Sequence, residues 1–336
     1  MNIQKVAQEA GVSVATVSRT FNFPDKVSAA TRSKVEAAAA RLQYVPNASA
    51  RNLRTQNTKT IGVLLPTFAN PVFTECLQGI AETAADRGFS IMPFTTAYTL
   101  EQELDSVRKL LNFGVEGVIL VVSNPKQSLA LKLLQATDTP YVLAYNWDPD
   151  HPCVSVNSQQ AFIELVLYLA QLGHQRIAMV SGQRHASDRA QQRYEGFIQG
   201  IEQAQLPLLP LIEVPFIDNA VEAIAQELQK ERTATALVCS NDLMAIRAIR
   251  AAHLCGYQVP LDMSVTGFDG VRLGQDLTPS LTSVVQPNAD IGRHSLELLI
   301  QHLTQHTPLH AGTSLLLPHT LQLAESSAAP STHSTT

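Results

Sequence analysis

Polar residues follow several short apolar runs of this sequence, and their types suit the binding of a small polar molecule. Asn146, Asn241 and Asp269 each stand within two residues of the end of such a run. Carboxylate and amide oxygens accept and share hydroxyl hydrogens, a chemistry that fits a sugar or another polar ring. Asn and Asp also cap helices and form turns without touching a ligand, so the pattern alone leaves both roles open.

The sequence offers no constellation for catalysis or for a metal. The ten histidines fall in no metal-ligand spacing, and there is no GxSxG, no Walker loop and no GxGxxG after an apolar run. We therefore expect no enzyme, no metal site and no cofactor. The cysteines show no CxxC spacing and are expected to be buried and reduced. They are Cys76, Cys153, Cys239 and Cys255.

The elements that position the polar residues are predicted from residue 60 onward. Apolar runs alternate there with helical patterns, which is typical of parallel sheets with crossover helices and predicts two doubly wound lobes. Ligands bind outside the carboxyl ends of such strands, where the polar residues stand. The runs are residues 60–65, 90–94, 117–121, 141–145, 176–181, 211–214, 236–239 and 264–267.

The first sixty residues predict a small all-α unit. Apolar spacings of three and four residues indicate a helix over 3–10, which Gly11 ends. Ser13 can cap a second helix over 14–20, and Ser28 can cap a third, 29–42. Two short helices joined by a tight turn that contains glycine form a helix-turn-helix. The expected fold is an all-α helix-turn-helix head plus an α/β body.

Length and composition fit a globular protein with a small unit joined to a larger one. The chain has 336 residues, of which 45% are hydrophobic and 16% charged. No N-terminal stretch has the apolar length of a signal peptide, and no run approaches the ~18 apolar residues of a membrane span. We therefore expect a cytoplasmic protein that does not bind membranes.

Charge is distributed unevenly along the chain. Residues 1–60 carry nine Lys and Arg against three Asp and Glu, a net charge of +6. Because the whole chain carries −5, the remainder carries −11. A basic head on an acidic body indicates that the head alone meets a polyanion, although a solvated basic surface would have the same charge.

Several spaced motifs give the head a specific character. They are Val6-Ala7, Ala10-Gly11-Val12-Ser13, Ala15-Thr16-Val17-Ser18-Arg19, Val27-Ser28, Tyr44-Val45-Pro46-Asn47 and Ala50-Arg51-Asn52-Leu53-Arg54. Their succession strongly resembles the DNA-binding head of the LacI/GalR repressor family. The resemblance implies that the second helix enters the major groove of double-stranded DNA.

On that resemblance, Val14, Ala15 and Thr16 at the start of the second helix would face base edges. Val14 and Ala15 cannot hydrogen-bond and would contact a thymine methyl group or exclude a neighbour, whereas Thr16 and Arg19 bring polar readout, Arg19 to a guanine. Ser13 and Ser18, with Asn22, would bind phosphates and fix the register. The expected contacts of the helix-turn-helix with DNA are Ser13, Val14, Ala15, Thr16, Ser18, Arg19 and Asn22.

Residues 47–55 resemble the hinge helix of the same family. Nine residues are too few for a stable isolated helix, since ~12–15 are needed for even marginal helicity, so this segment should order only when docked. In the family the paired hinge helices enter the minor groove, and Leu53 stands where a leucine wedges between base pairs. Asn52 departs from the usual Ser or Gly. The expected hinge contacts are Asn47, Ala50, Arg51 and Leu53.

The body resembles periplasmic sugar-binding proteins, as the bodies of this family do. On that resemblance Arg193, Asn241 and Asp269 would hydrogen-bond an effector, and aromatic residues would form apolar walls. Arg189 adds a second cation near Arg193, so an acidic sugar or a phosphate is also compatible. The expected effector contacts are Phe73, Asn146, Trp147, Arg189, Arg193, Phe216, Asn241 and Asp269.

The expected boundaries follow from these motifs. They are a helix-turn-helix at 1–46, a hinge and linker at 47–58, a body at 59–323 and a disordered tail at 324–336. The lobes would comprise 59–157 with 288–310, and 158–287 with 311–323. Val156-Asn157-Ser158 stands where the family usually shows Asp-Asn, so we expect different hydrogen bonding at that crossing between the lobes. The tail contains no leucine heptad, so we expect a dimer and not a tetramer.

The sequence thus predicts a repressor that binds a palindromic operator as a homodimer and responds to a small polar effector, sugar-like or acidic. Two alternatives remain. One is a small-molecule-binding protein without a role on DNA, which would need an export signal where the basic helices stand. The other is a doubly wound enzyme of sugar metabolism, for which no nucleophile or cofactor loop is found.

Overall fold

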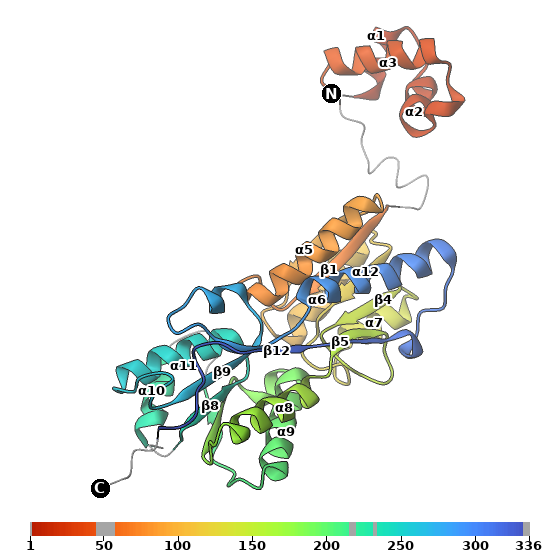
Figure 1. Cartoon of the computed structure of the whole chain (residues 1–336). Helices are drawn as coiled ribbons and strands as arrows, with labels where there is room; N and C mark the ends of the chain where they lie inside the picture. The colour runs from red at the N-terminus through yellow and green to blue at the C-terminus, as the bar shows by residue number, and fades with distance from the viewer. Residues whose placement is uncertain (1, 45–57, 215–219, 231–233, 332–336) are drawn as a thin grey trace. The chain divides into compact units, whose positions relative to one another are not determined.

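The computed structural model describes residues 2–44, 58–214, 220–230 and 234–331 (Figure 1). The chain divides into two compact units, Met1–Thr58 and Lys59–Thr336, which we call the head and the body. Among the described residues, no helix combines the length and the apolar character that crossing a membrane would require.

Local signals determine the fold of the head. Gly11 ends the first helix with a φ of 64°, and the hydroxyl of Ser13 caps the second by accepting from Thr16 N at 3.0 Å. Val6, Val17 and Val35 are fully buried in its core. The predicted helix-turn-helix is confirmed, and the second helix runs two residues further than predicted. The elements are α1 (Ile3–Ala10), α2 (Val14–Asn22), η1 (Pro24–Lys26) and α3 (Ala29–Arg41).

The first lobe of the body is built on a six-stranded parallel sheet with the order β11-β5-β4-β3-β1-β2. Its buried strands are continuously apolar, as parallel strands covered on both faces must be. The strands are β1 (Thr60–Leu65), β2 (Ser90–Thr95), β3 (Gly117–Leu120), β4 (Tyr141–Ala144), β5 (Cys153–Val156) and β11 (Leu315–Leu317). The helices are α5 (Pro71–Asp86), α6 (Leu100–Asn112), α7 (Leu129–Ala136) and α12 (Asn288–Gln305).

The second lobe has a similar sheet, with the order β12-β10-β9-β8-β6-β7 and one antiparallel pair, β10 with β12. The two predicted doubly wound lobes are confirmed. The strands are β6 (Ile177–Ser181), β7 (Ile212–Glu213), β8 (Ala236–Cys239), β9 (Ser264–Asp269), β10 (Thr282–Val285) and β12 (Thr320–Gln322). The helices are α8 (Ser158–Gln171), α9 (Asp188–Gln203), α10 (Ala220–Lys230), α11 (Asp242–Leu254) and the short η2 (Arg184–Ala186), η3 (Arg272–Gln275) and η4 (Ala311–Thr313).

The chain crosses between the lobes after β5, after β10 and between β11 and β12 (Figure 1). At the first crossing Asn157, part of the departure noted in the sequence, caps α8 by accepting from Gln160 N at 3.0 Å. The prediction that residues 311–323 belong to the second lobe is wrong for their first part. Leu315–Leu317 pair with β5 in the first sheet, because that apolar run covers an otherwise open edge.

Close packing of helix pairs makes each lobe stiff. In the first lobe, a Cβ on Gly79 would overlap the carbonyl group of Ala289, and a Cβ on Gly292 would overlap that of Cys76. Glycine at both positions therefore lets the backbones of α5 and α12 touch. In the second lobe, Gly196 of α9 approaches the backbone of α8 in the same way.

The predicted disorder of the tail is wrong for residues 324–331, which lie along the second sheet. Ser326 is fully buried, and its hydroxyl donates to the carbonyl oxygen of Val265 at 2.6 Å. Val265 N donates back to Ser326 O at 2.8 Å, and the imidazole Nε2 of His174 lies 2.9 Å from Ala328 O. The prediction was based on the low apolar content of the tail. Main-chain hydrogen bonds order this segment, and small Ser and Ala side chains allow them although the composition gives no sign of them.

Removal of this segment should destabilise the body. A chain that ends at Leu323 loses the hydrogen bonds of Ser326 and Ala328. At ~1 kcal/mol net for each bond, we expect the free energy of unfolding to fall by roughly 2–4 kcal/mol. Urea unfolding followed by circular dichroism measures the change. A chain that ends at Ser331 keeps these bonds and is the control, and equal midpoints for the two truncated chains would contradict the assignment.

Candidate functional site

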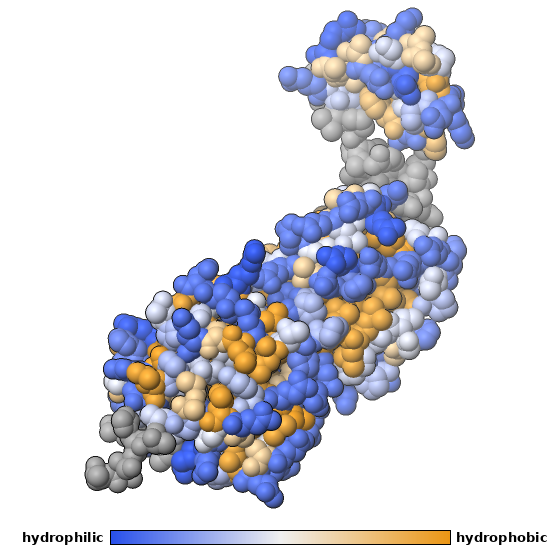
Figure 2. Space-filling view, viewed as in Figure 1, coloured by the Kyte–Doolittle hydropathy of each residue, from blue (hydrophilic) through white to orange (hydrophobic). Residues whose placement is uncertain are grey.

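The head presents one face of α2 to solvent. Val14, Ala15 and Arg19 are exposed, whereas Val17 and Thr20 on the opposite face are buried. They are three of the four residues that the sequence predicted to read bases, and the fourth, Thr16, is half-buried. Hydrophilic residues cover most of the visible surface of the head (Figure 2). This face therefore has the exposure that insertion into a groove requires.

The polar residues around α2 have roles within the helix as well. The Ser13 hydroxyl accepts from Thr16 N and lies 2.9 Å from the Thr16 hydroxyl, so it serves as the helix cap. Asn22 donates to the Ser18 hydroxyl at 3.2 Å. Phosphate contacts by these side chains would share or replace those bonds. The predicted hinge contacts Asn47, Ala50, Arg51 and Leu53 lie outside the described residues.

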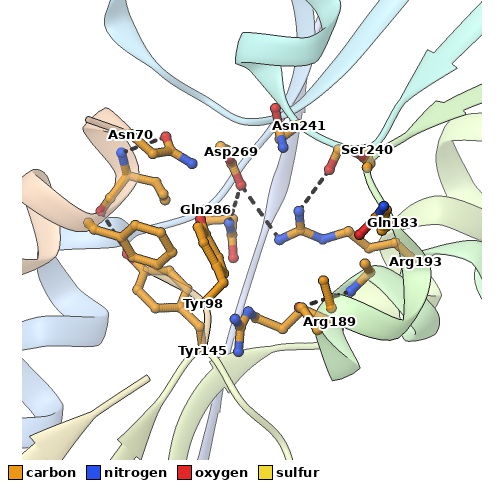
Figure 3. Close-up of a pocket in the computed structure, with 16 residues that line it drawn as sticks. Asn70, Tyr98, Tyr145, Gln183, Arg189, Arg193, Ser240, Asn241, Asp269 and Gln286 are labelled. Atoms are coloured by element: carbon orange, nitrogen blue, oxygen red, sulfur yellow. Dashed lines mark hydrogen bonds and ion pairs between the residues drawn. The ribbon is translucent and has the colours of Figure 1, made fainter. Parts of the chain in front are cut away.

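A cavity of about 370 Å³ lies in the body, where the carboxyl ends of strands from both lobes meet (Figure 3). Its size is within the range of small-molecule sites. The lining residues include the predicted Phe73, Arg189, Arg193, Asn241 and Asp269. The other lining residues are Asn70, Val72, Tyr98, Tyr145, Gly182, Gln183, Ala186, Ser187, Ala190, Ser240 and Gln286.

Two predicted effector contacts in the described part of the chain, Asn146 and Trp147, do not line this cavity. Asn146 is fully buried beside it, where its amide bonds to the backbone of Val122 and donates to Asp188 Oδ1 at 2.8 Å. Its polar atoms are used to join the lobes, which corrects the prediction. Trp147 is 37% exposed and is not among the lining residues, because the chain turns away after Tyr145 at a φ of 64°. Phe216 lies outside the described residues.

An ion pair dominates the second-lobe side of the cavity. Arg193 Nη2 lies 3.6 Å from Asp269 Oδ1, and Nη1 donates to the carbonyl oxygen of Ser240 at 2.7 Å. The guanidinium also stacks on the ring of Phe268, 4.1 Å from its centroid. Gln286 donates to the same Asp269 oxygen at 2.8 Å, as Figure 3 shows. The carboxylate is thereby held facing the cavity.

A second ion pair closes the cavity where α9 begins. Arg189 Nη1 lies 3.2 Å from Asp188 Oδ1 and donates to the carbonyl oxygen of Val122 in the first lobe at 2.9 Å. Asp188 N donates to Ser123 O, which also belongs to the first lobe. Burial raises the pKa of Asp188, and the Arg189 charge opposes that rise. Each lining cation thus has a carboxylate of its own.

Aromatic rings form the first-lobe side. Phe73 and Tyr145 meet edge to face, with centroids 5.7 Å apart, and the Tyr145 hydroxyl donates to Val72 O at 2.9 Å. Tyr98 completes this side from the loop after β2, and burial raises its pKa to about 12. Figure 3 shows Tyr98 and Tyr145 opposite the arginines. The cavity is therefore apolar on one side and ionic on the other.

The prediction did not name several lining residues, although the rule that it used applies to them. Tyr98, Gln183 and Gln286 all follow strand ends, as do the predicted polar residues. Tyr145 was assigned to the strand itself. Applying the strand-end rule to every run, β2 and β10 included, would have found these residues.

Strain and buried charge coincide at Asp269. Its φ of 119° is rare for any residue but glycine, and such strain is typical of functional sites. Burial raises its pKa to about 6, against the opposing effects of the Arg193 charge and the Gln286 hydrogen bond. Burial likewise lowers the pKa of Arg193. Both shifts express the cost of keeping this pair charged away from water.

Asp242 supports the strained turn from behind. Its carboxylate accepts from Val271 N and from the Ser283 hydroxyl, both at 2.6 Å. Burial and the charge of Asp269 raise its pKa to about 8, and the hydrogen bonds offset only part of that rise. Asp242 thus fixes the chain just after Asp269.

Several buried side-chain atoms near the cavity make no hydrogen bond. Among the described residues, the buried side-chain atoms without a hydrogen bond belong to segments that line or flank it. A buried polar atom without a partner costs free energy, so a polar ligand or water is expected to satisfy them. They are Thr96 Oγ1, Ser181 Oγ, Arg184 Nε, Asp188 Oδ2 and Arg193 Nε.

Known proteins resemble both units. Residues 2–47 match the family described as bacterial regulatory proteins, lacI family, and residues 166–327 match a periplasmic binding protein-like domain. The chain is 32% identical to catabolite control protein A of Priestia megaterium, over 97% of this chain and 99% of that protein. It is also 32% identical to the HTH-type transcriptional repressor PurR of Photobacterium profundum, over 90% and 91%.

A solved structure resembles the chain over nearly its whole length. The crystal structure of the Lac repressor dimer bound to operator and the anti-inducer ONPF superposes with a TM-score of 0.88 at 29% identity. The superposition covers 98% of this chain and 99% of that one.

Asp242 should make the body less stable as the pH rises. Its pKa is about 8 in the folded protein against an ordinary value of 3.8, so between these values the folded protein holds a proton that the unfolded chain has released. The free energy of unfolding should therefore fall between about pH 5 and about pH 8, by up to ~1.4 kcal/mol per pH unit. Urea titrations at several pH values measure this slope.

The control is Asp242→Asn, which does not titrate. Its amide oxygen can still accept from Val271 N, while the Ser283 hydroxyl can turn to Val284 O. The slope of stability against pH should be shallower in this variant. An identical slope would show that Asp242 is not the titrating group.

Proposed function

This chain belongs to the lacI family of bacterial regulatory proteins and is a DNA-binding transcriptional repressor, and we propose that it binds a palindromic operator as a homodimer controlled by a small polar effector. Like its relatives, it is a transcriptional regulator and not an enzyme. The observation that carries the proposal is the exposed face of α2, with Val14, Ala15 and Arg19, on a head whose residues 1–58 carry a net charge of +5.

The proposed homodimer matches the symmetry of a palindromic operator. Two identical heads on a two-fold body would bind two half-sites in opposite orientation, so the DNA site has the same two-fold symmetry. The body also exposes large apolar side chains, Leu254 and Leu273 among them, at 53% and 50%. In the proposed dimer, a second copy would bury side chains of this kind.

The effector is best matched by a neutral polyhydroxylated ring. Arg189 and Arg193 each pair with a carboxylate inside the protein, so little positive charge is left for an anion. The atoms without partners include both donors and acceptors, which hydroxyl groups satisfy together. The aromatic side would cover the C–H face of the ring. The acidic effector that the sequence also allowed is less well matched.

Effector binding would act by changing the arrangement of the lobes and hence the affinity of the heads for DNA. Couplings of this kind change affinity by roughly 5- to 150-fold. The likeness to a Lac repressor dimer bound to operator and an anti-inducer supports the proposal that the lobe arrangement described here is the operator-binding one.

Selection of bound duplexes from a random DNA library, at one fixed salt concentration, tests the proposed binding to a palindromic operator directly. The full-length protein should enrich a palindrome, and Arg19→Ala should bind it about tenfold or more weakly while losing preference at one base of each half-site, because a bidentate base contact is worth ~1–3 kcal/mol. The control is Arg32→Ala, since Arg32 pairs with Glu36 on α3 and should contribute little. If no sequence is enriched, the proposal of a palindromic operator is wrong.

Matched neutral and phosphorylated sugars test the effector class. In thermal unfolding of the wild type, neutral members of pairs such as glucose and glucose 6-phosphate should include one that raises the melting temperature, and its phosphate should not. The shift should shrink below about pH 6, because a protonated Asp269 is uncharged, accepts hydroxyl hydrogens more weakly and no longer forms an ion pair with Arg193, and it should vanish in Asp269→Leu. Stabilisation by the phosphates alone would favour an acidic effector.

A further inference from the structure

Asn288 lies where the chain re-enters the first lobe, at the first residue of α12, and it is only 3% exposed. Its Nδ2 donates to Oε2 of Glu75 in α5 at 2.9 Å and to the carbonyl oxygen of Asp269 at 3.1 Å. Its Oδ1 accepts from the Tyr145 hydroxyl at 3.2 Å. A single side chain therefore joins α5 and β4 of the first lobe to the end of β9 in the second.

Two of these partners belong to the effector cavity. Tyr145 and Asp269 line it from opposite lobes, and each stands at the end of a central strand with a positive φ, 64° and 119°. A ligand that contacts either residue acts on a position that is already strained. Asn288 does not line the cavity, yet it is bonded to both.

Asn288 cannot follow the second lobe if the lobes move. It begins α12, whose backbone touches α5 at Gly79 and Gly292, so it is fixed to the first lobe. Asp269 belongs to the second sheet. Rotation of one lobe against the other must therefore stretch or break the bond from Asn288 Nδ2 to Asp269 O, while the bond to Glu75 within the first lobe can persist.

We propose that Asn288, held by Glu75, is a positioning residue that latches the lobes in the arrangement described here and so sets the operator affinity of the ligand-free repressor. The inference rests on the proposed function and concerns the regulation of the same cavity. Glu75 orients the amide, and the amide holds Asp269. An effector that moves Asp269 or Tyr145 releases the latch.

The test measures operator affinity of the full-length protein without any small molecule. The probe is the palindrome recovered from the duplex library, and fluorescence anisotropy is recorded from 50 to 200 mM salt. Asn288→Leu removes all the side-chain bonds at similar volume and should weaken binding at least fivefold. Glu75→Leu should act in the same direction, and the double variant should be no weaker than the weaker single variant, because one latch is broken in each.

Two controls separate a latch from general damage. Glu75→Gln keeps an acceptor oxygen for Asn288 Nδ2 and should stay within twofold of the wild type. The slope of log affinity against log salt should be the same in all variants, because the latch changes a population and not the number of phosphate contacts. Should Asn288→Leu fail to fold, as judged by urea unfolding, Asn288→Asp replaces it, since a carboxylate there cannot donate and faces Glu75.

The outcomes are distinct. If the wild type selects a palindrome and Asn288→Leu or Asn288→Asp binds it within twofold of the wild type, the latch is wrong and the proposed function stands. If the losses from Asn288→Leu and Glu75→Leu multiply in the double variant, the residues act separately and the latch is equally wrong. If the wild type selects no sequence, the proposed function is wrong, and the inference about Asn288, which rests on it, is wrong as well.

Discussion

The body is organised by the meeting of the carboxyl ends of two parallel sheets. Parallel strands are apolar along their length, so their polar residues gather at the ends, and here both sets face one cavity. Arg193 and Asp269 are brought together away from water, at a cost visible in the raised pKa of Asp269. Backbone strain at Asp269, the buried ion pairs and the polar atoms without a hydrogen bond all follow from that arrangement.

The same arrangement separates stiff parts from compliant ones. Within the lobes, α5 with α12 and α8 with α9 touch backbone to backbone at glycines, so little can shift there. Between the lobes, hydrogen bonds reach the cavity at Asn146 and Arg189 on one side and at Asn288 on the other. A ligand in the cavity would lie beside these bonds.

Features whose partner residues are close together in the sequence could be predicted, and features whose partners are far apart could not. Helix caps such as Ser13 involve residues three positions apart, so the head could be predicted from local spacing. Asp269 and Asn241 could be predicted because strand ends are also local signals. Asn146 could not be assigned correctly, since its role depends on Asp188, a residue of the other lobe. The order of residues 324–331 could not be predicted for the same reason, because the residues that they bond, Val265 and His174, lie far away in the sequence.

The energies at the junction are of the size that regulation requires. A hydrogen bond contributes ~1 kcal/mol net, so the few bonds that join the lobes at the cavity together contribute a few kcal/mol to this arrangement. Allosteric couplings are typically ~1–3 kcal/mol, and a ligand shifts an equilibrium only by its differential affinity for the two states. The bonds that cross between the lobes at the cavity, from Arg189 to Val122 and from Asn288 to Asp269 among them, are therefore of a size that a small ligand can offset.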